Sequence, residues 1–191
     1  MQEKLIRILK KIVVKVIGVN GDKIIDILYK KQKVNEFSIS EKLSLTINQT
    51  RNILYKLADA GLVGFIRKKD KKKGGWYIYF WTLKTKKVIQ KAQEETISEI
   101  ERLKKELEAR KKERYYYSKS IDVEYTEEEA LQNNFICPET GEVLELRDTS
   151  QIQESAMKEI KKHEEALEEK NKELTEIEDS EKKMNEKKMK A

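Results

Sequence analysis

The fold is decided by residues 51–83, which read RNILYKLADAGLVGFIRKKDKKKGGWYIYFWTL. The first ten place Leu54 and Leu57 on a helical period, and Gly61 is suited to end that helix in a left-handed conformation. The stretches 62–67 and 76–83 change to a two-residue period and flank a basic, glycine-ended loop at 68–75. This order predicts a helix over 49–60 followed by a β-hairpin.

The residues before this stretch predict further helices. Residues 2–17 form an amphipathic pattern that stops near Gly18, a second helix begins after Asp22, and a short one covers 37–43. Residues 44–48 read as the turn before the helix at 49–60. Helices in this order, followed by a hairpin, predict a winged helix over 1–84, which is a helix-turn-helix with a β-hairpin wing.

The remainder predicts a mainly α protein with a small β content. Residues 85–114 have the apolar spacing of a long, coiled-coil-like helical linker. Residues 115–147 are richer in aromatic and β-prone residues, and 148–191 predict a charged C-terminal helix with a disordered tail. Neither helix can bury its apolar stripe alone, so each is expected to pair with another element or another chain.

Charge is unevenly distributed along the chain. The net charge is +6, but residues 1–90 carry 21 Lys and Arg against 7 Asp and Glu, whereas both later parts are acidic. A polyanion or an acidic protein surface is therefore the expected partner of the first domain. No stretch approaches the ~18 apolar residues of a membrane span, so no membrane partner is expected. The single cysteine, Cys137, fits a reducing compartment, and we expect a cytoplasmic, nucleoid-associated protein.

The hairpin supplies two sets of candidate contact residues. The predicted wing is basic enough to follow a phosphate backbone, although a solvated loop is the alternative. Its cations are Arg67, Lys68, Lys69, Lys71, Lys72 and Lys73. In the second strand only one face can be buried, so the outward rings are candidates for contact with protein or single-stranded DNA. The aromatic candidates are Trp76, Tyr77, Tyr79, Phe80 and Trp81.

The predicted recognition helix is weakly basic. Its expected outward set includes only two cations and consists of Asn48, Gln49, Arg51, Asn52 and Lys56. Asn, Gln and Arg can read base edges, but this set does not favour recognition of duplex sequence by the domain alone. No nucleophile–base set or phosphate loop is present, so neither an enzyme nor a cofactor is predicted.

Two motifs give a family resemblance. Arg51-Asn-Ile-Leu-Tyr-Lys-Leu57 fits R-x-x-L-Y-x-L, and Gly75-Trp-Tyr-Ile-Tyr-Phe-Trp81 fits G-W-x-x-Y-x-W. With the basic wing between them, the chain resembles archaeal transcription factor E, which corresponds to the alpha subunit of eukaryotic TFIIE. The resemblance implies a second domain that is a zinc ribbon. The four ligand positions fall here on Ser118, Ile121, Cys137 and Thr140, so we expect a degenerate ribbon without metal.

The resemblance also implies partners and a function. A factor of this family binds RNA polymerase at its clamp and stalk in the promoter complex with TBP and TFB. It assists DNA melting and contacts the non-template strand, and in some archaea a smaller TFIIE-beta-like subunit accompanies it. Two other interpretations remain open. One is a sequence-specific winged-helix repressor that dimerises through its helices, and the other is a coiled-coil structural protein with a docking domain.

Overall fold

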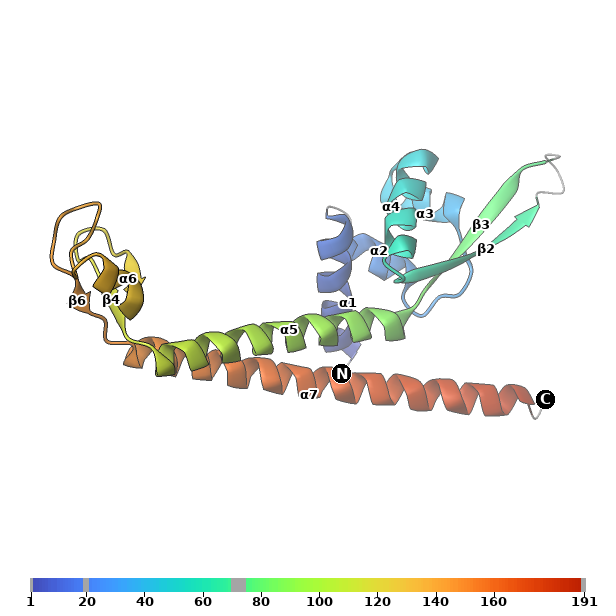
Figure 1. Ribbon diagram of the computed structural model, residues 1–191. Helices are drawn as coiled ribbons and strands as arrows, with labels where there is room; N and C mark the ends of the chain where they lie inside the picture. Colours follow the sequence, from blue (N-terminus) through green and yellow to red (C-terminus); the bar gives the residue numbers. More distant parts are fainter. Residues whose placement is uncertain (1, 19–20, 70–74, 190–191) are drawn as a thin grey trace. The chain divides into compact units, whose positions relative to one another are not determined.

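The computed structural model describes residues 2–18, 21–69 and 75–189 and is drawn in Figure 1. The chain forms two compact units. The first combines Met1–Glu94 with Glu169–Ala191, and we call it the N-terminal unit. The second, Glu95–Glu168, is called the central unit. The first turns of one long helix and the last part of another therefore belong with the winged helix.

The N-terminal unit contains the predicted winged helix. Helices α1 (Gln2–Ile17), α2 (Gly21–Leu28), α3 (Glu36–Leu43) and α4 (Ile47–Asp59) precede the hairpin of β2 (Val63–Lys69) and β3 (Tyr77–Leu83). A short strand, β1 (Val34–Asn35), pairs with the other edge of β3, so the antiparallel sheet has the order β1-β3-β2. In the hairpin, Phe65 lies opposite Trp81 and Lys69 lies opposite Tyr77. The predicted fold class is confirmed.

Three helices begin earlier than the sequence predicted, and α3 does so by one residue, at Glu36. Helix α2 starts at Gly21, and α1 passes so close to this residue that a Cβ there would come within 2.8 Å of the Val14 Cα. Helix α4 starts at Ile47 because Thr46 and Gln49 form a capping box, in which each side chain bonds the other residue's backbone N–H. Gly61 follows α4 with a φ of +73°, as predicted.

The core of the N-terminal unit joins α1–α4 to the sheet and to both long helices. Helix α5 (Thr85–Lys112) contributes Val88, Ile89 and Ala92, which are buried. Leu174 and Ile177 of α7 (Ser150–Met189) pack against the same core. Ion pairs from Lys4 to Glu169 and from Lys86 to Glu178 flank these apolar contacts. The C-terminal helix therefore has an intramolecular partner within this unit.

The central unit consists of a helix pair and a small ribbon-like sheet. Ile100, Leu103 and Leu107 of α5 bury Ile160 of α7, with Leu167 packed alongside. The sheet has the order β5-β4-β6, formed by β4 (Tyr115–Tyr117), β5 (Glu124–Thr126) and β6 (Glu145–Leu146). Helix α6 (Glu127–Gln132) follows β5, and a small core of Ala130, Cys137 and Leu144 lies beneath it.

The prediction of a disordered tail was wrong for most of its length, because α7 remains helical to Met189. Glu, Lys and Met have high helix propensity, which offsets the low hydrophobicity of this segment. Among the described residues, no helix is long and apolar enough to cross a bilayer.

Candidate functional site

Arg51 of α4 is held in an ion pair instead of facing outward. Its Nε and Nη2 donate to the two carboxylate oxygens of Glu36 at 2.9 and 2.8 Å. Glu36 is completely buried, whereas the Arg51 side chain is 27% exposed. The backbone N–H of Tyr79 donates to the same carboxylate at 3.4 Å, and the Arg51 guanidinium lies 5.7 Å from the Tyr79 ring centre. This arginine joins α3, α4 and β3, so its prediction as a base-reading residue is corrected.

The rest of the recognition-helix set remains accessible. Asn48, Gln49, Asn52 and Lys56 are exposed, but Gln49 also closes the capping box with Thr46. The pKa of Arg51 is raised by its hydrogen bond to Glu36, so its cation is already committed within the fold. Lys56 is thus the one cation of this set without an assigned structural contact, which leaves α4 with little charge for a DNA backbone.

An aromatic cluster connects α4 to the hairpin. Tyr55 makes edge contacts with Phe65, Tyr79 and Trp81, with ring centres 6.4, 6.4 and 5.7 Å apart. Phe65 lies against Trp81 at 5.0 Å. Trp81 is completely buried, so its prediction as a contact residue was wrong. Alternation along β3 turns this ring toward the core together with Leu83.

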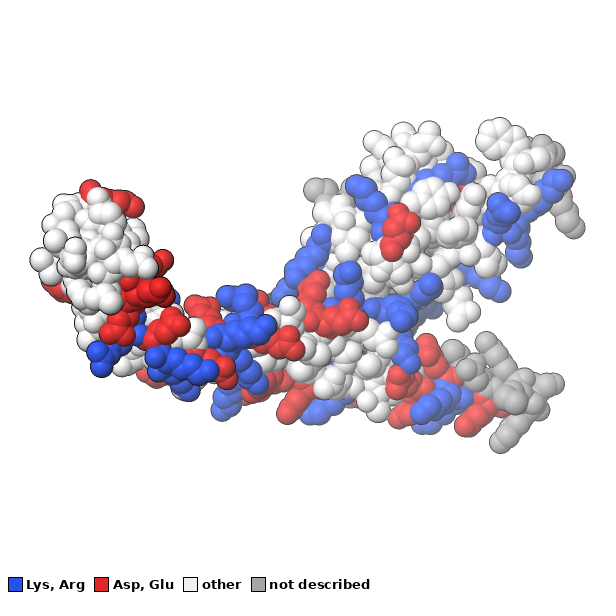
Figure 2. All heavy atoms as spheres, in the orientation of Figure 1, with Lys and Arg blue, Asp and Glu red and all other residues white. Residues whose placement is uncertain are grey.

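The outer end of the hairpin combines cations with exposed rings. Trp76 is 69% exposed and Tyr77 is 44% exposed. The Arg67 guanidinium lies 4.8 Å from the centre of the Tyr77 ring, and the Lys68 ammonium lies 5.7 Å from that of Phe80. Phe80 and Tyr79 are half-buried. Figure 2 shows Lys and Arg side chains along this hairpin.

We call Arg67, Lys68, Lys69, Trp76 and Tyr77 the wing surface. The other predicted wing cations, Lys71, Lys72 and Lys73, lie outside the described residues. Cation–π contacts keep Arg67 and Lys68 close to aromatic faces, where a base could stack next to a neutralised phosphate. This surface can therefore bind a single strand or an acidic protein without any base-specific hydrogen bond.

Sequence reasoning missed Glu36 and Phe65. A glutamate at the start of a short helix reads as a solvent-facing residue near a favourable dipole, and only the approach of Arg51 explains its burial. Phe65 precedes the cations of β2 and lies opposite Trp81 in the hairpin. This pairing was the available signal for its place in the aromatic cluster.

Two turns of the ribbon-like sheet region, around Ser118 and Cys137, share one backbone hydrogen-bond pattern. In the first, the N–H of Ser118 donates to the Val123 carbonyl and that of Asp122 donates back to Ser118. In the second, Cys137 and Glu142 are joined in the same way, and Gly141 donates back to Cys137. Asp122 and Gly141 occupy matching left-handed positions, with φ of +50° and +73°. The two turns therefore have matching backbone geometry, and they carry the ligand positions that the family resemblance implied.

Hydroxyl groups and a carboxylate fill the space between the knuckles. Ser118 Oγ is buried, donates to Glu142 Oε2 at 2.9 Å and lies 3.4 Å from Thr140 Oγ1. Ser120 Oγ donates to the same carboxylate oxygen at 2.7 Å. These hydrogen bonds, that of Ser120 first, hold the pKa of Glu142 below its usual value. Ile121, the remaining ligand position, is 38% exposed.

These residues do not fit a zinc ion. Zn²⁺ in a structural site needs four Cys or His ligands, and Cys137 is the one soft donor among the four positions. Its thiol meets the Tyr125 hydroxyl at 3.5 Å, and hydrogen bonds from Thr140 and Tyr125 lower the pKa of Cys137 to about 6. The same contact raises the pKa of Tyr125 to about 12. Among the described residues there is no cluster of three His, Cys, Asp or Glu side chains that could hold a metal.

Comparison with known proteins gives a consistent match. The family model for the TFIIE alpha subunit matches residues 7–112. Transcription factor E of Pyrococcus horikoshii is 35% identical over 146 residues, which are 74% of this chain and 76% of that protein. The factor of the same name from Methanocaldococcus jannaschii is 34% identical over 144 residues, covering 74% and 81%. That of Metallosphaera sedula is 30% identical over 151 residues, covering 77% and 85%.

Proposed function

The chain belongs to the TFIIE alpha subunit family and is a transcription factor rather than an enzyme, and we propose that it binds RNA polymerase in the promoter complex and assists DNA melting. The proposed partners are the polymerase clamp and stalk, with TBP and TFB on the promoter. A smaller TFIIE-beta-like subunit is proposed as an accessory partner of the winged helix.

The observation that carries this proposal is the difference in available charge and exposed aromatic surface between α4 and the wing surface. The arginine of α4 is locked onto Glu36, whereas the wing surface presents three cations beside two exposed rings. Stacking and phosphate neutralisation tolerate any sequence, so such a surface suits melted DNA better than a specific duplex site. Contact with the non-template strand is therefore assigned to the wing surface.

A factor of this kind acts by shifting a population. It favours the open complex only to the extent that it binds the open complex more tightly than the closed one. Exposed rings meet unstacked bases in the open complex alone, so the wing surface supplies that difference. A preference of about 1.4 kcal/mol would raise the ratio of open to closed complexes tenfold.

Permanganate probing of promoter melting tests the proposal. Reactions with polymerase, TBP and TFB are compared with and without the full chain, and thymines in the melted region should become more reactive when the chain is present. The variant Arg67→Gln/Lys68→Gln/Lys69→Gln should lose most of the stimulation, with the largest loss at moderate salt. A matched variant, Lys105→Gln/Lys161→Gln/Lys162→Gln, removes the same charge from the central unit and should keep it. Equal stimulation by both variants would refute the role of the wing surface.

A sequence-specific repressor is the second candidate. It is favoured by the exposed amides of Asn48 and Asn52, which are able to bond base edges. Footprinting of the isolated chain separates the two functions. A tight palindromic footprint on promoter DNA, absent from random DNA, would support the repressor and overturn the proposal above.

A further inference from the structure

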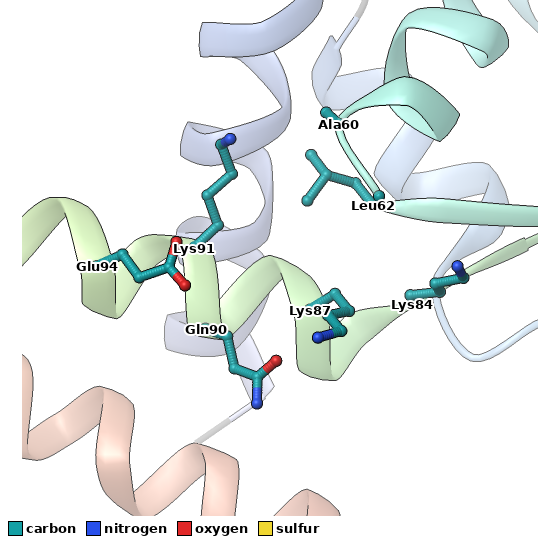
Figure 3. A pocket seen from close by; sticks show the side chains of 8 residues that line it. Ala60, Leu62, Lys84, Lys87, Gln90, Lys91 and Glu94 are labelled. Carbon is teal, nitrogen blue, oxygen red and sulfur yellow. The ribbon is translucent and has the colours of Figure 1, made fainter.

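A basic pocket lies between the end of α4 and the start of α5, on the N-terminal unit. Its volume is about 320 Å³, and Ala60, Gly61 and Leu62 form one wall. The other wall is formed by the first ten residues of α5, with Lys84 immediately before the helix and then Lys87, Gln90, Lys91 and Glu94. Figure 3 labels Lys84, Lys87 and Lys91 along this wall. The Lys91 side chain extends from α5 across the space from Leu62. Three cations and one carboxylate thus line it.

Lys87 and Lys91 lie on one face of α5, four residues or about 6 Å apart along the axis, and Lys84 immediately precedes the helix. Lys84 lies next to β2, since a Cβ added at Gly64 would meet its Cε at 3.0 Å. The lack of a side chain at Gly64 therefore leaves the room that the Lys84 stem occupies.

The position of these cations is unfavourable for the protein alone. The N-terminal end of a helix carries partial positive charge and is stabilised by acidic side chains. The first turn of α5 contains no acidic residue and instead follows Lys84 with Lys86 and Lys87. Lys86 is neutralised by Glu178, whereas Lys84 and Lys87 add positive charge to an already positive end, and Lys91 lies one turn further along the same side. A bound anion would relieve this repulsion.

Three carbonyls at the end of α4 already accept backbone hydrogen bonds. The partial negative charge of this helix end resides on the last carbonyls, but those of Lys56, Leu57 and Ala58 accept hydrogen bonds from Ala60, Leu62 and Gly61. The same bonds occupy the N–H groups of that wall, so an anion in the pocket would be held by lysines and by the start of α5. Recognition would then depend on charge rather than on a backbone cradle.

We propose that Lys84, Lys87 and Lys91 form a second nucleic-acid contact that binds a phosphodiester backbone. An acidic protein surface fits less well, because protein interfaces need an apolar anchor and the apolar side chain in this wall, Leu62, is buried. Lysines act as point charges that suit phosphate, whereas planar pairing with carboxylates is the property of arginine. The inference relies on the proposed function only for the presence of promoter DNA.

Binding of labelled DNA to the full chain tests this contact without polymerase. Fluorescence anisotropy is measured with a fluorescein-labelled single strand and a duplex of about 20 nucleotides, between about 50 and 200 mM KCl. The variant Lys84→Gln/Lys87→Gln/Lys91→Gln is compared with Lys105→Gln/Lys161→Gln/Lys162→Gln, which removes the same charge elsewhere. Loss of three phosphate contacts should make the slope of log K against log salt shallower by about 2 for the single strand or about 3 for the duplex. A form of DNA whose slope changes by the amount expected for three contacts is held by the pocket, and a form whose slope is unchanged is not.

Several results would overturn the proposal. One is an equal slope for the two variants, and another is the absence of measurable binding of either DNA by the unaltered chain. A third is that the pocket substitutions weaken the binding of poly-glutamate but leave the binding of DNA unchanged. The melting temperature of the pocket variant should equal or exceed that of the unaltered chain because the repulsion at α5 is removed. A lower melting temperature would assign the lysines a structural role instead. Because the assay omits polymerase and its factors, this contact and the proposed function can fail independently.

Discussion

Replacing Arg51 by Met should destabilise the N-terminal unit, because it leaves a buried charge without its partner. Glu36 is completely buried and receives two charge-assisted hydrogen bonds from Arg51, at 2.8 and 2.9 Å. Removing one partner of a buried pair costs about 3–5 kcal/mol. The Arg51 side chain retains 27% exposure, so we expect a smaller loss, of about 2–3 kcal/mol.

A double-mutant cycle isolates the interaction. Urea unfolding is followed by the fluorescence of Trp81 in a Trp76→Phe background, so that the buried indole is the reporter for all proteins. Glu36→Gln removes the charge and keeps the shape, and Arg51→Met/Glu36→Gln buries a neutral amide. We expect this double variant to be more stable than Arg51→Met by about 1 kcal/mol, since an unpaired carboxylate is costlier than an amide.

The result that refutes this reasoning is an Arg51→Met variant within about 0.5 kcal/mol of the parent, the range of an ordinary surface substitution. Additive single effects would also count against it, because two residues in one buried pair must couple. Arg51→Lys keeps the charge but loses the planar fork, and it should recover less than half of the loss.

Three further outcomes are expected. Trp81→Leu should lower the free energy of unfolding by about 3 kcal/mol because the ring is buried in the aromatic cluster, whereas Trp76→Leu should change it by no more than about 0.5 kcal/mol. Similar urea midpoints for the two variants would contradict the burial of Trp81 and the exposure of Trp76. The pKa of Glu142 is lowered in the folded chain, so its ionised carboxylate stabilises the ribbon above pH 4.5, the ordinary pKa of the group, and this stabilisation is lost as the pH falls through the lower pKa of the folded state. Near-UV circular dichroism of the ribbon tyrosines should therefore show an acid transition that Glu142→Gln weakens. An identical transition in the variant would show that Glu142 does not cause it. Elemental analysis should find well under one zinc per chain, and a stoichiometric metal would overturn the reading of the ribbon.

Much of the winged helix could be predicted because its signals are local. The stripe of α1, the capping glycine after α4 and the change of period at the hairpin are each contained in a few consecutive residues. The start of α4 was missed although its capping box, Thr46 with Gln49, is an equally local signal, and the start of α2 at Gly21 was missed as well.

The roles of the site residues were harder to predict from the sequence. Arg51 and Trp81 stand in the motifs that gave the family resemblance, and both proved to hold the fold together. A motif identifies residues that recur together, but it does not separate packing from contact with a partner. The burial of Glu36 and the cluster around Tyr55 made that distinction.

By itself the sequence determined the winged helix, the basic first half and the family, because composition, period and motif spacing are properties of the residues themselves. Only the tertiary structure decided which cations remain free. The guanidinium of Arg51 is neutralised because Glu36, which is distant along the chain, reaches it. A lysine on a helix is exposed or paired according to what packs beside it, and Lys86 is paired with Glu178. Those pairings depend on long-range packing, and they removed Arg51 from the expected nucleic-acid contacts and drew attention to the lysines at the start of α5.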